Sequence, residues 1–192
     1  MKDPVKRADD AERMRRVKEG DELAFRQIVD MFREPILRLC HQYIGVQEEA
    51  EEVAQDVFLH LYRAAATYEP RAKLSTFLYR IAVNLSLNRI RDTKRKRLVS
   101  LDMLQTCRPE DPADAESRPD HDLERKEKAE AIRRVIDTLP ESQKTALILK
   151  RYHGLSYDEI ARVMHCSVPS VESRLHRAKQ TLTESLKRFL IS

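Results

Sequence analysis

Residues 155–179 read LSYDEIARVMHCSVPSVESRLHRAK, and this stretch carries the start and stop signals of two short helices joined by a tight turn. Ser156 and Glu159 have the S-x-x-E spacing of a capping box, which satisfies free amide groups at a helix start. Gly154, just before them, can take the left-handed backbone that ends a helix. Ser167 can cap a second helix with Pro169 in its first turn. The spacing therefore predicts a helix-turn-helix.

The second helix of this pair carries polar side chains suited to contacts with DNA. Val171, Leu175 and Ala178 form its apolar stripe, which leaves its other faces polar. An arginine there can bind guanine O6 and N7 together or clamp a phosphate. A solvated surface helix carries similar charges, but the caps, the turn and the preceding helix favour DNA binding. The candidate DNA-contacting residues are Ser170, Glu172, Ser173, Arg174, His176, Arg177 and Lys179.

Composition restricts the class of protein. The 192 residues include three glycines and no tryptophan, and the formal net charge is +4. No apolar run approaches the length needed to span a bilayer, and the polar N-terminus lacks the apolar core of a signal peptide. We therefore expect a cytoplasmic protein with no membrane insertion.

The cysteines predict free thiols and no metal site. Cys40, Cys107 and Cys166 are far apart and odd in number, which argues against disulfides. No paired Cys or His spacing indicates a metal site or other cofactor.

Two small helical domains are predicted, with an acidic linker between them. Helical periodicity fills residues from about 12 to 97 and from about 123 to the end, and no convincing strand pattern occurs. Residues 100–122 combine three prolines with many carboxylates and almost no apolar periodicity. We expect an all-α protein with an N-terminal extension at 1–19 of no assigned role, a first domain at 20–98, a flexible acidic linker at 99–124 and a second domain at 125–192.

The first domain contains a strongly acidic helix. Asp21 can cap the helix before it, which Pro35 should bend or restart. The acidic helix is predicted from about residue 47 to residue 66. Carboxylates near a helix start are favoured by the helix dipole, but Gln55 and Asp56 lie deeper. A face that docks a basic protein surface and a plain solvated face therefore both remain open.

The last helix of the first domain has a basic and amide-rich side. Its exposed positions carry a run of basic and amide side chains at near-helical spacing, and residues 94–97 add a basic cluster that attracts phosphates. Asparagine can read exposed base edges. Tyr68, Phe77 and Tyr79 could stack an unpaired base, but aromatic residues at helical spacing are more often core, which we favour for Phe77. The candidate nucleic-acid residues here are Arg80, Asn84, Asn88 and Arg91.

With both domains in this order, the chain resembles a group IV sigma factor, the extracytoplasmic-function type of the sigma-70 superfamily. EEAEEVAQDVFLHLYRA, residues 48–64, resembles region 2.2 of that family, and STFLYRIAVNLSLNRIR, residues 75–91, resembles regions 2.3 and 2.4. LPESQKTALILKRYHGLSYDEIARVMHCSVPSVESRLHRAK, residues 139–179, resembles regions 4.1 and 4.2. Two departures stand out. Glu172 lies where many relatives have a basic residue, and Leu78 follows Phe77 where a Trp-Leu pair is usual.

The resemblance implies an initiation factor without catalytic residues, which binds core RNA polymerase through its β and β′ subunits and directs transcription from specific promoters. It implies that Glu52, Gln55 and Asp56 dock onto the polymerase clamp helices. The first-domain candidates above would handle the minus-ten element, and the helix-turn-helix would read the minus-35 duplex. It further implies that the linker enters the polymerase active-site cleft, although an ordinary tether explains the linker too, and that an anti-sigma factor holds the protein inactive.

Two other functions compete with this reading. A regulator could bind duplex DNA through the helix-turn-helix alone and use the first domain for sensing or dimerisation. Such a regulator would bind DNA unaided, whereas sigma factors of this family usually mask their DNA-binding surfaces until polymerase separates the domains. A metal-dependent nuclease or phosphotransferase could use the carboxylates at 48–56. The enzyme is disfavoured because no glycine-rich phosphate loop or nucleophile pattern is present.

Overall fold

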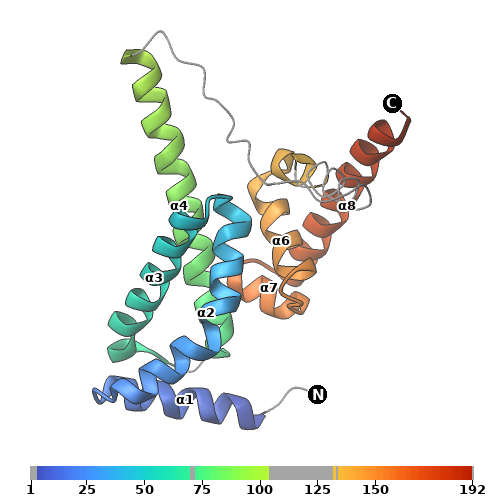
Figure 1. The fold of residues 1–192 in the computed structure, drawn as a ribbon. Coiled ribbons are helices and arrows are strands. Elements are labelled where there is room, and N and C mark those ends of the chain that lie inside the picture. Colours follow the sequence, from blue (N-terminus) through green and yellow to red (C-terminus); the bar gives the residue numbers. More distant parts are fainter. Residues whose placement is uncertain (1–3, 70–71, 104–131, 133, 192) are drawn as a thin grey trace, which may run out of the picture.

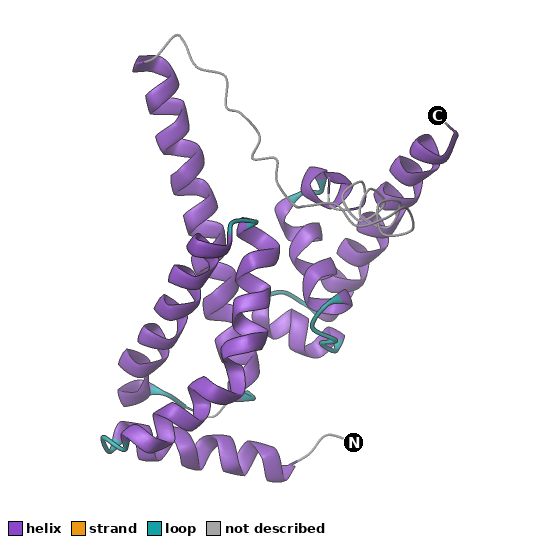
Figure 2. Cartoon of the chain, viewed as in Figure 1, coloured by secondary structure: helices purple, strands orange, loops and turns teal. Residues whose placement is uncertain are grey.

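A computed structural model describes residues 4–69, 72–103, 132 and 134–191, and every regular element in these ranges is helical (Figure 2). The first group of helices comprises α1 (Pro4–Lys18), α2 (Glu22–Ile44), α3 (Gln47–Ala64), a 3-10 turn η1 (Ala65–Thr67) and α4 (Leu74–Met103). The second group comprises α6 (Glu141–Arg151), α7 (Tyr157–Val163) and α8 (Val168–Ile191), preceded by helical residues 134–138. The all-α fold class is confirmed. Most of the predicted linker lies outside the described residues.

Helices α2, α3 and α4 pack into a bundle around an apolar core (Figure 1). Ile28 and Leu39 from α2, Leu61 from α3 and Leu78 from α4 are fully buried there. The period of 3.6 residues on α3 explains its contribution, because apolar residues at that spacing share one face. The apolar residues on that face are buried: Ala50, Val53, Ala54, Val57, Phe58 and Leu61.

Helix α2 is capped as predicted but is not interrupted at its proline. Asp21 Oδ1 accepts a hydrogen bond from the Ala24 amide at 3.0 Å, and Gly45 ends the helix with φ of 84°. Pro35 lies inside the helix, so of the two predicted effects, a bend or a restart of the helix, the restart is wrong. A proline costs an interior helix about 3 kcal/mol. Buried apolar residues lie both before and after it, among them Ile28 and Ile36, and burial of such side chains is favourable enough to offset that cost.

Helix α1 is part of the packed structure. Met14 is 1% exposed and Val17 is 4% exposed, and both belong to the same apolar core as the α2–α4 bundle. Arg16 Nη2 lies 2.6 Å from Asp21 Oδ2 and ties the end of α1 to the cap of α2. The stretch for which the sequence suggested no role therefore contributes to the first domain's core.

Helix α4 is longer than predicted, because it runs to Met103 and so includes residues 99–103 that we had expected to open the linker. Leucine and methionine favour helix, and Pro109 is the first proline after α4 begins. The chain thus has no local reason to leave the helix at residue 98.

The second helical group forms a smaller core and packs against the first. Leu149 of α6, Ile160 of α7, and Val171 and Ala178 of α8 are fully buried. Helix α7 contacts α4 of the first bundle, and one apolar cluster joins residues of both groups (Figure 1). The two predicted domains are therefore in direct contact in this structure.

Candidate nucleic-acid interface

The helix-turn-helix forms with the caps that its sequence predicts. Ser156 Oγ accepts a hydrogen bond from the Glu159 amide at 3.4 Å, and Glu159 Oε2 accepts one from the Ser156 amide at 2.9 Å. Ser167 Oγ accepts from the Ser170 amide at 3.4 Å at the start of α8. Between the helices His165 has φ of 49°, a left-handed backbone that glycine or asparagine adopts more readily. The tight turn thus fixes the direction in which α8 leaves α7.

The candidate DNA-reading face of α8 is largely open to solvent. Glu172, Ser173, His176, Arg177 and Lys179 are exposed, and Ser170 and Arg174 are half-buried. Arg174 differs from the others because its Nη1 lies 3.3 Å from Cys166 Sγ and 4.0 Å from Met164 Sδ. Its guanidinium therefore contacts the turn as well as the exposed face.

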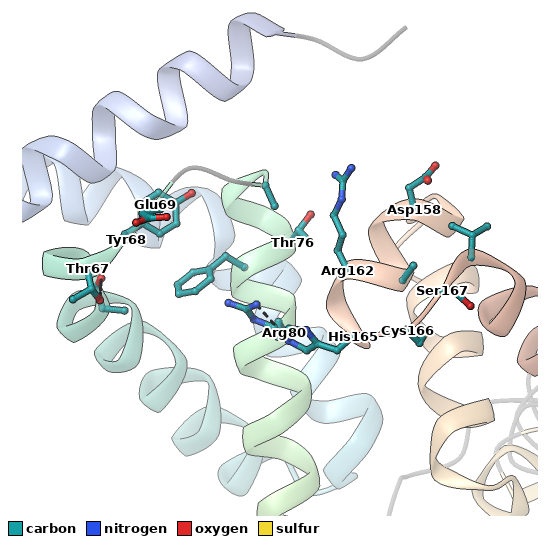
Figure 3. A pocket seen from close by; sticks show the side chains of 15 residues that line it. Thr67, Tyr68, Glu69, Thr76, Arg80, Asp158, Arg162, His165, Cys166 and Ser167 are labelled. Atoms are coloured by element: carbon teal, nitrogen blue, oxygen red, sulfur yellow. Dashed lines mark hydrogen bonds between the residues drawn. The ribbon is translucent and has the colours of Figure 1, made fainter.

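On α4, two of the four candidate residues contact the second helical group. Asn84 and Asn88 are exposed. Arg91 donates to Asn88 Oδ1 at 3.4 Å and lies 3.5 Å from Glu141 Oε1 at the start of α6. Arg80 lies over the Phe77 ring, 5.1 Å from its centroid, and its Nη1 is 3.4 Å from His165 Nε2 (Figure 3). Both arginines thus have partners across the domain contact.

A partly buried ion pair also crosses this contact. Lys73 Nζ lies 3.0 Å from Glu159 Oε1, and the two side chains are 33% and 15% exposed. Burial by itself would raise the pKa of Glu159, but the hydrogen bonds from Ser156 and the pairing with Lys73 outweigh it and lower the pKa from 4.5 to about 2. Glu159 therefore stays ionised, and it serves both the cap of α7 and the contact between domains.

His153 fills a second part of the domain contact. Its Nε2 is 3.0 Å from Gln42 Oε1 of α2, and its ring meets the ring of Tyr79 edge-on with centroids 5.2 Å apart. Burial, with a smaller effect of the Arg38 charge, lowers the pKa of His153 from 6.5 to about 4. The imidazole is therefore neutral at pH 7.

A cavity of about 1120 Å³ lies between the two helical groups. Tyr68, Phe77 and Arg80 line one wall, and Arg162 and His165 line the other (Figure 3). Phe77 is half-buried and meets the Tyr68 ring edge-on at 5.4 Å between centroids. Phe77 thus packs against the core while also facing this cavity.

The acidic face of α3 lies away from these contacts. Glu52, Gln55 and Asp56 are all exposed. Arg89 of α4 reaches this face and donates from Nη2 to Glu52 Oε2 at 3.0 Å. The three candidates therefore share one accessible surface of the helix, and one of them has a partner on α4.

Neither a metal site nor a membrane span is found in the described part of the chain. None of its Cys, His, Asp and Glu side chains form a group of three or more that could hold an ion. None of its helices has an apolar stretch long enough to cross a bilayer. Cys40 and Cys166 are free thiols, as predicted, and Cys107 lies outside the described residues.

Comparison with known proteins identifies the family. Residues 28–96 match Sigma-70 region 2 and residues 129–182 match Sigma-70, region 4. The ECF RNA polymerase sigma factor SigW of Bacillus subtilis is 32% identical over 179 residues, which cover 91% of this chain and 95% of the relative. The chain belongs to the ECF sigma factors. The RNA polymerase sigma-H factor of Pseudomonas aeruginosa is also 32% identical, over 94% of this sigma factor and 95% of the relative.

Solved structures share the fold of this sigma factor. CnrH, in complex with the cytosolic domain of CnrY, has a TM-score of 0.67 and 20% identity over 93% of this chain and 97% of that one. RpoE of Bartonella quintana, in complex with the anti-sigma factor NepR, has a TM-score of 0.63 and 23% identity over 85% and 96%. The resemblance to the family is confirmed: the protein is a sigma factor that directs transcription, and sigma factors are initiation factors rather than enzymes.

Lys73, Glu159 and Arg89 form ion pairs that sequence reasoning missed. Glu159 had been assigned only a capping role, and Lys73 and Arg89 had no assigned partner. Lys73 and Glu159 are 86 positions apart, and Arg89 and Glu52 are 37 apart. Helical periodicity reports on neighbours three or four positions away, so no signal in a single sequence pairs these residues.

Proposed function

We propose that this sigma factor docks onto core RNA polymerase through Glu52, Gln55 and Asp56 on α3. What supports this is that all three side chains are exposed on one helix of the Sigma-70 region 2 match. Opposite charges steer two proteins together and disfavour wrong partners. A basic surface on the β′ or β subunit is the complement that this face requires.

The two DNA-binding roles divide between the domains in this proposal. The α4 side chains Arg80, Asn84, Asn88 and Arg91 contact the minus-ten element. The α8 side chains contact the minus-35 duplex: Ser170, Glu172, Ser173, Arg174, His176, Arg177 and Lys179. Arginine and lysine on phosphates supply affinity, and contacts to base edges supply sequence preference. Glu172 can accept from cytosine N4 or repel a phosphate, so it sets the promoter sequence apart from those of relatives with a basic residue there.

In this proposal, docking onto polymerase comes before contact with the minus-ten element. Arg80 and Arg91 are engaged by His165 and Glu141 of the second domain, while the α3 face remains exposed. The free protein can therefore present its docking face before its minus-ten face is released. Polymerase that binds the two domains at separate places would break the Lys73–Glu159 contact and free both arginines.

An anti-sigma factor is the proposed regulator, acting in the cytoplasm where polymerase is found. Support comes from the fold shared with CnrH and RpoE, which were solved with CnrY and with the anti-sigma factor NepR. The cavity between the domains is lined by side chains from both of them, including Arg80 and Arg162. A partner segment bound there would hold the domains in contact and keep Arg80 away from DNA.

The test is transcription reconstituted from purified core polymerase and genomic promoter fragments. We expect promoter-dependent initiation with wild-type protein, and a loss of core binding and of initiation with Asp56→Ala. Asp30→Ala, which removes an exposed carboxylate from α2, is the matched control and should change neither. Soluble protein that supports no initiation on any fragment would contradict the proposal.

A second measurement tests the order of events. Binding of the free protein to promoter DNA should be weak and should rise when core polymerase is added. Equal DNA binding with and without core would contradict masking of α4 by the second domain.

A further inference from the structure

Arg89 connects the two functional helices of the first domain. It extends from α4, and its Nη2 donates to Glu52 Oε2 of α3 at 3.0 Å, while its Nη1 lies 3.8 Å from Glu49 Oε2. Its side chain is 30% exposed, whereas that of Glu52 is 63% exposed. The less exposed arginine therefore holds a carboxylate that is itself open to a partner.

Arg89 does not lie on the candidate minus-ten face of its own helix. Successive residues of an α-helix are rotated by about 100°. Asn84 and Asn88 are nearly in line along the axis, so Arg89 points well to one side of them, toward α3. Its partners on α3 confirm this direction. The geometry thus places Arg89 with the docking face rather than with the DNA-contacting face.

We infer that Arg89 is a positioning residue, which fixes the Glu52 carboxylate for docking onto a basic side chain of RNA polymerase. The inference rests on the docking function proposed above. A free glutamate side chain loses rotamer entropy when a partner immobilises it, and groups ordered in advance lose less. Arg89 binds one oxygen of Glu52, Oε2, and a carboxylate has acceptor sites on both oxygens. Oε1 can therefore take a donor from polymerase while Arg89 keeps its hydrogen bond.

The Arg89 guanidinium also reduces the repulsion between carboxylates on the acidic face of α3. Glu49 and Glu52 are three positions apart on α3, a spacing at which like charges repel one another. Arg89 lies within 4 Å of both carboxylates, and it reduces that repulsion without covering Glu52. Removal of Arg89 would let the two carboxylates move apart, so Glu52 would leave the orientation that docking needs.

Stability of the bundle does not account for this arrangement. Helices α3 and α4 are already joined through fully buried apolar side chains such as Leu61 and Leu78. Ion pairs with exposed members add little to folding stability. Loss of Arg89 should therefore leave the fold intact and act on polymerase binding.

The experiment measures the dissociation constant of full-length variants for core RNA polymerase, by competition with fluorescently labelled wild-type protein. We expect Arg89→Ala to weaken binding about three- to fivefold at low salt, and Arg89→Lys to restore part of the loss. In a Glu52→Ala background, Arg89→Ala should have no further effect. Arg15→Ala is the control, because Arg15 is likewise paired with two carboxylates, Glu12 and Glu19, but lies on α1, away from the docking face.

The outcomes separate this inference from the proposed docking function. If Glu52→Ala and Asp56→Ala leave core binding unchanged, the docking assignment fails. If they weaken binding but Arg89→Ala does not, or if Arg89→Ala weakens it equally in the Glu52→Ala background, positioning by Arg89 is wrong. A melting temperature lowered by Arg89→Ala but not by Arg15→Ala would also overturn it, because the effect would then be structural.

Discussion

The substitution Glu159→Gln tests the ion pair that joins the two domains. Glutamine can still accept a hydrogen bond from the Ser156 amide, since capping boxes use either residue, so the change removes mainly the charge opposite Lys73. The full shift of the Glu159 pKa from 4.5 to about 2 corresponds to about 3 kcal/mol. Ser156 accounts for part of this value, and solvent screens the one-third exposed Lys73. We therefore expect a loss of about 1–2 kcal/mol in the free energy of unfolding.

The assay is urea unfolding of the wild type, Lys73→Gln, Glu159→Gln and the double variant at pH 7. If Lys73 and Glu159 interact, the double variant should lose less free energy of unfolding than the sum of the two single variants. Either change alone already removes the interaction. The folded-state pKa of Glu159 is depressed, so its contribution is complete above pH 4.5 and disappears as the pH falls toward 2. Small-angle scattering should also show a larger radius of gyration for either variant.

Lys144→Gln serves as the control for this prediction. It breaks an ion pair with Asp137 in which both residues belong to the second domain, so it can change stability but not the spacing of the domains. Additive losses for Lys73→Gln and Glu159→Gln, or an equal expansion in Lys144→Gln, would refute the assignment of Lys73 and Glu159 as a link between domains.

Three further predictions concern single side chains. Ile160→Ala should cost about 2–5 kcal/mol in urea unfolding because Ile160 is fully buried, whereas Leu175→Ala should cost clearly less because Leu175 is half-buried; equal losses would contradict the assigned packing. The pKa of His153 is lowered from 6.5 to about 4, so its contribution to stability should be complete above pH 6.5 and fall away toward pH 4. His153→Gln should flatten that pH dependence, and an unchanged pH profile would count against burial of the ring. Arg177→Ala should reduce the salt dependence of promoter binding if Arg177 contacts a phosphate, or relax the preference at one base pair if it reads a base; an unaltered footprint and initiation rate would exclude both.

Features encoded within a few residues were predictable from the sequence. The capping box of Ser156 and Glu159, the Ser167 cap and the Asp21 cap all formed as their spacing indicated. The buried face of α3 followed from its helical period. These features depend on neighbours one to four positions apart, where backbone geometry fixes which groups can meet.

Features that depend on packing between distant segments were not predictable. The continuity of α2 through Pro35 depends on the core that its two halves share, and a local rule for proline cannot include that core. Likewise, the contact between Arg80 and His165 requires the approach of two domains whose motifs each appear complete in the sequence. The roles of the site residues stay predictions, because no local pattern in a sequence specifies what a polar side chain binds.

The burial of Met14 and Val17 in α1 bears on how this protein should be prepared. A shortened version that starts at Gly20, the start of the first domain expected from the sequence, would uncover apolar surface on the bundle and would be expected to aggregate. An N-terminal purification tag should be placed before Pro4, so that α1 can still pack against the bundle.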